Sequence, residues 1–242
     1  MGGVRTKRIL AVCLIITVIQ LLSFIIPKQA LADFGANEAF SYDLAADLNG
    51  QSGGSGFGGN WSSTAGKFDI VSLLCESGNC PQSDANSDAV ATRALGSASA
   101  LGSLSFYILY TVTNENTGGF KLRSSAANRV LVHSDASGNI EVCGTTCEDI
   151  QATFSTNTLY KITVEYGAFG TCIADQVRAK VEGGSFSSCL TMSNSGDVDE
   201  IVLEASDVGG TILEQFLVDT IVDIPSAVAA APAVEIILFN DF

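Results

Sequence analysis

Apolar and polar residues alternate with a period of two along much of the chain. Five segments show this alternation: 104–112, 160–166, 177–182, 201–205 and 216–222. Successive side chains of a β-strand point to opposite faces, so each segment predicts a half-buried antiparallel strand. In the last segment, the residues expected to share the apolar face are Phe216, Val218, Thr220 and Val222.

Glycine- and asparagine-rich turn signals separate these segments. They occur at 116–119, 137–139, 183–184 and 209–210. After residue 32, helical periodicity is limited to one short turn expected within 148–154. Many strands without intervening helices predict an all-β fold, and about 210 residues suit an antiparallel sandwich of two sheets.

The first 32 residues have the layout of a secretory signal peptide. The stretch 5–8 holds three basic residues, and 9–26 is an uncharged, mostly apolar run. Small residues at Ala30 and Ala32 predict cleavage after Ala32. An uncleaved anchor is the alternative, because a run of 18 residues can just span a bilayer. Pro27 and the small-residue site favour cleavage, which predicts a secreted, periplasmic or cell-surface protein without integral membrane association.

Charge and composition narrow the range of partners. After residue 32 the chain carries 8 basic and 26 acidic residues, a net charge of −18, so nucleic acid is excluded as a partner. With 47% hydrophobic and 16% charged residues, the chain is too apolar to be disordered. We expect one folded domain at 33–222. An Ala/Pro linker and a short apolar tail follow at 223–242.

An even number of cysteines follows the signal peptide. An exported chain with six cysteines is expected to form three disulfides. Their spacing favours sequential pairing, one of 15 connectivities: Cys75–Cys80, Cys143–Cys147 and Cys172–Cys189. A zinc site is disfavoured, because there is no CxxC pair and the single histidine, His133, is not near any cysteine pair.

The stretch 38–63 carries a pattern of aromatic residues and glycines: F-x-Y, then L-x-G-Q, then G-G-x-G-F-x-G-x-W. The residues that match it are Phe40, Tyr42, Leu48, Gly50, Gln51, Gly53, Gly54, Gly56, Phe57, Gly59 and Trp61. This pattern resembles the opening of concanavalin A-like (laminin-G-like) jelly-roll domains of secreted bacterial proteins. Looser matches at 68–72, 159–166 and 216–222, the last containing Asp219, extend the resemblance over 33–222.

The resemblance implies a sandwich of two curved antiparallel sheets that often binds glycans on one concave face. Members of the family are lectins or sugar-binding modules, glycan-cleaving enzymes, or adhesive and structural proteins. The three cysteine pairs are not part of the family pattern. We therefore expect an exported, non-catalytic carbohydrate-binding or adhesive module. The alternative is a cell-surface or matrix structural protein without a small ligand, and a glycan-cleaving enzyme is a more distant one.

Few residues stand out as candidates for a site. Trp61 is a candidate sugar-stacking residue, although packing in the core is the competing interpretation. Asp197 and Asp199 are candidate calcium ligands, because hard cations favour clustered carboxylates. The carboxylates of 197–204 depart from the same-face alternation expected of the glycan-cleaving relatives, so no catalytic residue is expected. No cofactor is required, and calcium is the one ion the pattern suggests.

Overall fold

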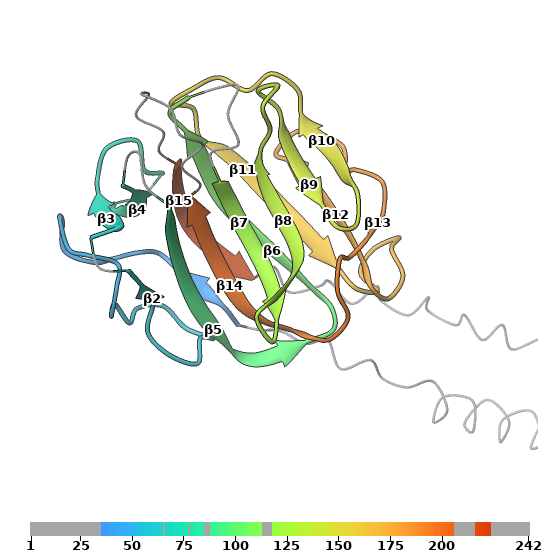
Figure 1. Ribbon diagram of the computed structural model, residues 1–242, viewed down its shortest axis with the longest axis horizontal. Helices are drawn as coiled ribbons and strands as arrows, with labels where there is room; N and C mark the ends of the chain where they lie inside the picture. Colours follow the sequence, from blue (N-terminus) through green and yellow to red (C-terminus); the bar gives the residue numbers. More distant parts are fainter. Residues whose placement is uncertain are drawn as a thin grey trace, which may run out of the picture. The chain divides into compact units, whose positions relative to one another are not determined.

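The computed structural model describes residues 35–64, 66–76, 78–84, 88–112, 118–205 and 216–223, and the signal peptide predicted at 1–32 lies outside them. So does the predicted linker and tail, apart from Asp223, which ends the last strand. This part of the chain forms an all-β sandwich of two antiparallel sheets (Figure 1), as the alternation predicts. None of the described residues belongs to a helix long and apolar enough to cross a membrane.

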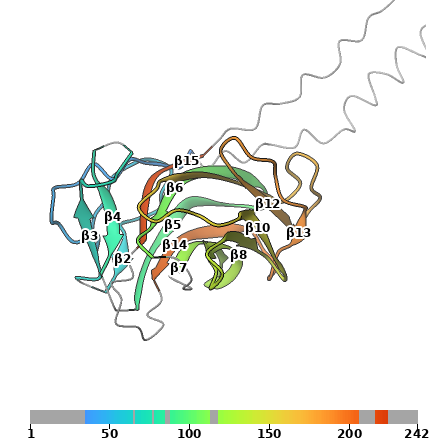
Figure 2. The same cartoon turned by 90° about the horizontal axis from the view of Figure 1, so that it is seen from above.

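Within the described residues, one sheet has eight strands and the other has seven. The order in the first is β13 (Leu190–Thr191), β12 (Gln176–Val181), β11 (Tyr160–Tyr166), β6 (Gly102–Tyr110), β15 (Phe216–Asp223), β4 (Cys80–Ser83) and β3 (Phe68–Val71), with β1 (Asn37–Glu38) paired to β15. The order in the second is β10 (Cys147–Gln151), β9 (Ile140–Cys143), β8 (Ala127–Ser134), β7 (Gly118–Ser124), β14 (Val198–Ala205), β5 (Ala89–Ser99) and β2 (Ser62–Ser63). Figure 2 shows the sheets as two stacked layers, with β6 in one and β7 and β14 in the other.

The core lies between the sheets and is filled by the apolar faces of the alternating segments. Leu104, Phe106 and Ile108 of β6 are fully buried, as are Ile201 and Leu203 of β14. Across the core, the rings of Phe106 and Phe120 stack with centroids 4.0 Å apart. Contacts of this kind between large buried side chains provide most of the favourable free energy of folding.

Two local predictions from the sequence are wrong. In β15 a register shift between Asp219 and Val222 changes the face of the strand, so that Ile221 is buried while Thr220 and Val222 are partly exposed. Such a bulge inserts one residue and reverses the alternation beyond it. The segment expected to form a helical turn at 148–154 instead contributes β10, which pairs with β9.

The opening motif surrounds a buried ion pair between Glu38 of β1 and Arg93 of β5. Arg93 donates from Nη1 to Glu38 Oε2, and the two side chains are 3% and 1% exposed. The remaining guanidinium donors reach backbone carbonyls of the glycine-rich loop, with Nε 2.9 Å from Gly59 O and Nη2 2.6 Å from Gly53 O. A buried charge pair is tolerated only when its other hydrogen-bonding atoms are also satisfied, as they are here.

The aromatic residues of the motif satisfy the carboxylate. Glu38 accepts hydrogen bonds from the backbone N–H of Phe40 (2.8 Å), the hydroxyl of Tyr42 (2.8 Å) and Nε1 of Trp61 (3.4 Å). Burial, and then the hydrogen bond to Glu38, raise the pKa of Tyr42 to about 12, so its hydroxyl remains a donor. The Trp61 ring stacks on Phe40 with centroids 5.9 Å apart and is 1% exposed. The motif is therefore structural at these positions.

Gly54 is required where the opening segment meets the glycine-rich loop. Its φ is +67°, and a Cβ at this position would lie 2.2 Å from the carbonyl oxygen of Asn37. That close approach allows Asn37 and the neighbouring Ser55 to exchange two backbone hydrogen bonds of 3.0 and 2.9 Å. Glycine alone combines this φ with this contact.

The three sequential cysteine pairs are present as disulfides: Cys75–Cys80, Cys143–Cys147 and Cys172–Cys189. The two cysteines of each pair are separated by five, four and 17 positions in the sequence, respectively. Three disulfides indicate an oxidising, extracytoplasmic environment.

Replacing Gly54 and Gly50 by alanine separates steric collision from backbone strain. Both residues have positive φ, +67° and +82°, but nothing lies within 4 Å of a Cβ at Gly50. We predict that Gly50→Ala lowers the free energy of unfolding by about 1 kcal/mol and Gly54→Ala by about 2–4 kcal/mol. Urea denaturation monitored by tryptophan fluorescence measures both. Equal losses in the two variants would contradict the role assigned to the Asn37 contact.

Candidate functional site

Strand register places a row of polar residues across the outer face of the seven-stranded sheet. Neighbouring strands pair Glu204 of β14 with Gly119 of β7, then His133 of β8, Glu141 of β9 and Asp149 of β10. The core residues of these strands lie at the alternate positions, so this row faces away from the core. Residues far apart in the sequence thus form one continuous strip.

A second row lies beside the first. It runs from Val202 through Lys121 and Leu131 to Cys143 and Cys147, which are direct cross-strand partners. Val202 is fully buried and Lys121 is 8% exposed, although neither belongs to the core between the sheets. This part of the outer face is therefore covered by neighbouring groups.

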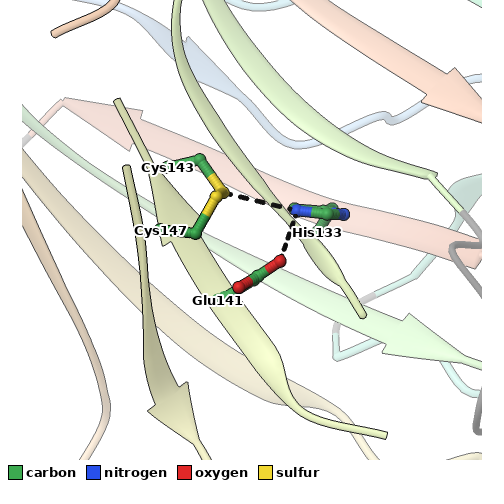
Figure 3. Close-up of side chains that lie close together, drawn as sticks. All are labelled: His133, Glu141, Cys143 and Cys147. Carbon is green, nitrogen blue, oxygen red and sulfur yellow. Dashed lines mark hydrogen bonds and ion pairs between the residues drawn. A yellow bond between two sulfur atoms is a disulfide. The ribbon is translucent and has the colours of Figure 1, made fainter. Parts of the chain in front are cut away.

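The two rows meet at His133, which lies against a disulfide and a carboxylate (Figure 3). Its Nε2 is 2.9 Å from Oε1 of Glu141 and 3.4 Å from Sγ of Cys143. The expectation that His133 is not near any cysteine pair is wrong, because antiparallel pairing of β8 with β9 brings position 133 next to 141 and 143. Only the register of three strands reveals this contact.

Burial and charge act in opposite directions on this histidine. Burial lowers the pKa of His133 below its ordinary value of 6.5, while the nearby Asp135 raises it. The pKa of Glu141 is raised by burial and by the charges of Asp135 and Asp149. Burial outweighs the charges, so the 2.9 Å contact is best described as a neutral imidazole N–H donating to Glu141.

Two further carboxylates share the outer face of β14. Glu200 and Glu204 both project outward, and a register shift near Val198 sets their direction. Lys121 Nζ is 2.5 Å from Glu204, and Arg123 lies 3.7 Å from both carboxylates. A glycosidase needs one protonated carboxyl and one free carboxylate beside the scissile bond. Both candidates here are paired with cations.

A hollow of about 440 Å³ lies at one end of β6, β11 and β12. Its lining includes Tyr107, Tyr160, Lys161, Glu182 and Gln151. Lys161 lies over the Tyr107 ring, 5.7 Å from its centroid, and makes a 3.2 Å ion pair with Glu182. An aromatic ring bordered by hydrogen-bonding groups is a composition suited to a polar ligand with an apolar face.

The residues singled out in the sequence do not gather at this hollow. Trp61 is buried with one face against Phe40 and its Nε1 on Glu38, so the structure contradicts its assignment as a sugar-stacking residue. Asp197 is exposed, and Asp199 accepts the backbone N–H of Ser125 at 3.0 Å. Neither belongs to the groups of three or more potential metal ligands found among the described residues. Their assignment to calcium remains a prediction.

No family model matches the chain, and no curated protein matches it in sequence. Solved structures match its fold. The apo Crh5 transglycosylase is 11% identical with a TM-score of 0.54, covering 81% of this chain and 86% of that one. The β-glucanase of Bacillus licheniformis is 10% identical with a TM-score of 0.50, covering 77% and 95%.

A sialidase matches with 9% identity and a TM-score of 0.54 over 69% of this chain, which spans 17% of the sialidase. These structures establish that the sandwich has the fold of the concanavalin A-like lectins and glucanases, as the opening motif predicts. At this level of identity, the similarity concerns the fold.

His133 is the single histidine of the chain, so its imidazole signals can be followed directly by NMR. We predict a pKa below 6.5, because burial disfavours the imidazolium more than the charge of Asp135 and the hydrogen bond with the Ser134 backbone favour it. Lys121 opposes protonation as well. Between the folded pKa and 6.5 the unfolded chain binds a proton that the folded chain does not. His133 therefore makes the free energy of unfolding fall as the pH falls through 6.5.

The Asp135→Asn variant provides the matched control, since it removes a charge that raises the pKa of His133. We expect its imidazole to titrate at a still lower pH. A wild-type pKa above 6.5 would show that the carboxylates outweigh burial, contrary to this description.

Proposed function

We propose that the chain is an exported, non-catalytic carbohydrate-binding or adhesive module. The observation that carries this proposal is the hollow bordered by Tyr107 and the Lys161–Glu182 pair. A sugar presents an apolar face that stacks on an aromatic ring and hydroxyls that exchange hydrogen bonds with charged and amide groups. The export signal predicted at 1–32 and the three disulfides are consistent with a glycan or surface component outside the cytoplasm as partner.

The charges around the hollow favour neutral glycans over acidic ones. The lining contains Glu76 and Glu182 but a single cation, Lys161. An anionic sugar would meet the repulsion of these carboxylates and of the net charge of −18 that residues 33–242 carry. Selectivity would then rest on shape and hydrogen bonding.

The absence of catalysis is part of the proposal. The ion pairs of Lys121 and Arg123 with Glu200 and Glu204 support it, since these carboxylates share a face but neither is free. Glu141, whose pKa is raised, is the carboxyl that a glycan-cleaving enzyme would use as an acid. One of its oxygens is engaged by His133. If the wild-type protein hydrolyses a bound glycan and the Glu141→Gln variant does not, the chain is an enzyme and not a binding module.

A structural role without a small ligand is the second candidate. It is favoured by exposed leucines near the edge strand β3: Leu73 is 75% exposed, Leu74 is 40% and Leu44 is 59%. Leu44 adjoins Ala45, whose N–H donates to Ile70 of β3. Apolar side chains at a sheet edge favour association with another surface.

A glycan array probed with residues 33–242 tests the proposal. We expect selective binding of neutral glycans, and we expect Tyr107→Ala to weaken it at least tenfold, the loss of about 1.4 kcal/mol or more that truncating a contacting aromatic ring produces. Thr163→Ala is the matched control, because Thr163 lies on the outer face of β11 beyond the hollow. Repeating the array with chelator separates calcium-dependent from metal-free binding.

A blank array with the wild-type protein folded and its disulfides intact would overturn the carbohydrate-binding role. The structural candidate then predicts concentration-dependent self-association that Leu73→Ser reduces. Glycan binding that Tyr107→Ala leaves unchanged would retain the function but exclude this hollow.

A further inference from the structure

The contact of His133 with a disulfide on the outer face of the seven-stranded sheet serves neither the core nor the hollow. We propose that His133, Glu141, Cys143 and Cys147 form a thiol-dependent zinc site, which binds Zn²⁺ when the Cys143–Cys147 disulfide is reduced and releases it when the disulfide forms again. This proposal is independent of glycan binding, because the two sites share no residue.

The positions of the four side chains match the needs of zinc. One ligand atom from each of the four lies within 4.8 Å of all the others. Figure 3 shows His133 directed toward both the sulfurs and Glu141. A tetrahedral ion with bonds of about 2.0–2.3 Å places its ligands roughly 3.3–3.8 Å apart. The Nε2–Sγ distance of 3.4 Å falls in that range, and 2.9 Å to Glu141 requires a small opening.

The ligands come from a rigid framework that does not depend on the disulfide. Cys143 and Cys147 are directly paired at the end of the β9–β10 ladder, and the next positions along the strands are also paired. The loop between them is tied to a neighbouring segment. Thr145 N donates to Thr191 O at 2.7 Å, and the hydroxyl of Ser193 donates to Gly144 O at 2.6 Å. Reduction therefore leaves both sulfurs close to His133.

Two glycines provide the space that this arrangement needs. A Cβ at Gly119, the cross-strand partner of His133, would lie 2.9 Å from the histidine Cα and Cβ. A Cβ at Gly144 would lie 2.0 Å from the carbonyl oxygen of Thr191. Glycine at position 119 lets β7 approach β8 at His133. Glycine at position 144 lets the loop between Cys143 and Cys147 pack against the backbone of Thr191.

The surroundings favour a divalent cation. Asp135 and Asp149 lie close to Glu141, so the site carries excess negative charge. A hydrogen bond with the backbone of Ser134 orients the imidazole ring. Two thiolates, an imidazole and a carboxylate are ligand types that zinc accepts together.

The redox step balances with a dithiol as the reductant. The disulfide accepts two electrons and two protons, giving two thiols, while the dithiol becomes a disulfide. Binding of Zn²⁺ then displaces the two thiol protons, and the imidazole proton moves to the other ring nitrogen. Exchange with an oxidised disulfide returns the cysteines to the bonded state and expels the ion.

The other two disulfides provide internal controls. Among the described residues, no metal-ligand group includes Cys75–Cys80 or Cys172–Cys189. The Cys75–Cys80 pair closes a loop of similar size without a histidine. Its thiols would bind a metal more weakly than the cluster at His133.

Cobalt(II) titration of residues 33–242 in a phosphine reductant tests the site. We expect one Co²⁺ per chain, with a thiolate-to-cobalt charge-transfer band and the visible bands of tetrahedral coordination. Zinc should displace the cobalt. His133→Ala should weaken binding at least tenfold, and the double variant Cys143→Ser/Cys147→Ser should abolish the charge-transfer band. The double variant Cys75→Ser/Cys80→Ser should leave the cobalt affinity and the charge-transfer band unchanged.

Binding that survives His133→Ala and Cys143→Ser/Cys147→Ser would overturn the proposal, and so would a folded reduced chain that binds no cobalt. Circular dichroism establishes that each sample is folded.

If full reduction unfolds the chain, the oxidised protein is treated with limiting phosphine, with and without Zn²⁺, and the peptide containing Cys143 is analysed for alkylation. We expect zinc to increase the reduced fraction of this pair but not of Cys75–Cys80, because it binds only the dithiol. Equal reduction with and without zinc contradicts the site.

Discussion

The ion pair between Glu38 and Arg93 joins the two sheets of the sandwich at a point from which water is excluded. Glu38 belongs to β1 in one sheet and Arg93 to β5 in the other. Desolvating two charges costs several kcal/mol for each ion, and their attraction offsets this only when the other polar atoms are satisfied. The carbonyls of Gly53 and Gly59 satisfy the guanidinium, and the donors of Phe40, Tyr42 and Trp61 satisfy the carboxylate. The glycine-rich loop therefore supplies the backbone acceptors that the buried guanidinium of Arg93 requires.

This constraint explains why the opening motif indicates the fold and not a ligand. Its aromatic side chains pack against other residues of the sandwich. The Trp61 ring stacks on Phe40, and the centroid of the Phe57 ring lies 4.1 Å from the guanidinium carbon of Arg93. A binding role must therefore come from residues outside the motif. Tyr107 of the hollow and His133 of the strip lie on the outer faces of opposite sheets. The scaffold thus presents two separate surfaces of different chemistry.

The sequence predicts most of the fold because the alternation is local. The inward faces of β6, β11 and β12 follow directly from their apolar positions, and the sequential disulfides follow from short spacings. The bulge at 219–222 is not predicted, because no residue type in the sequence indicates where a strand takes up one extra residue. The role of Arg93 is not predictable from the sequence either, because its partner Glu38 lies 55 positions earlier. The candidate sites depend on register: Gly119, His133 and Glu141 come together only once three strands are paired.

A double-mutant cycle on Glu38 and Arg93 tests the central constraint most directly. Glu38→Gln, Arg93→Met and the double variant are compared with the wild type by urea denaturation. Each single change leaves one buried charge without its partner. We predict that the double variant is more stable than the sum of the single losses implies, by about 2–3 kcal/mol. Losses that add to within about 0.5 kcal/mol would show that the two side chains act independently, and that the pair does not hold the sheets together.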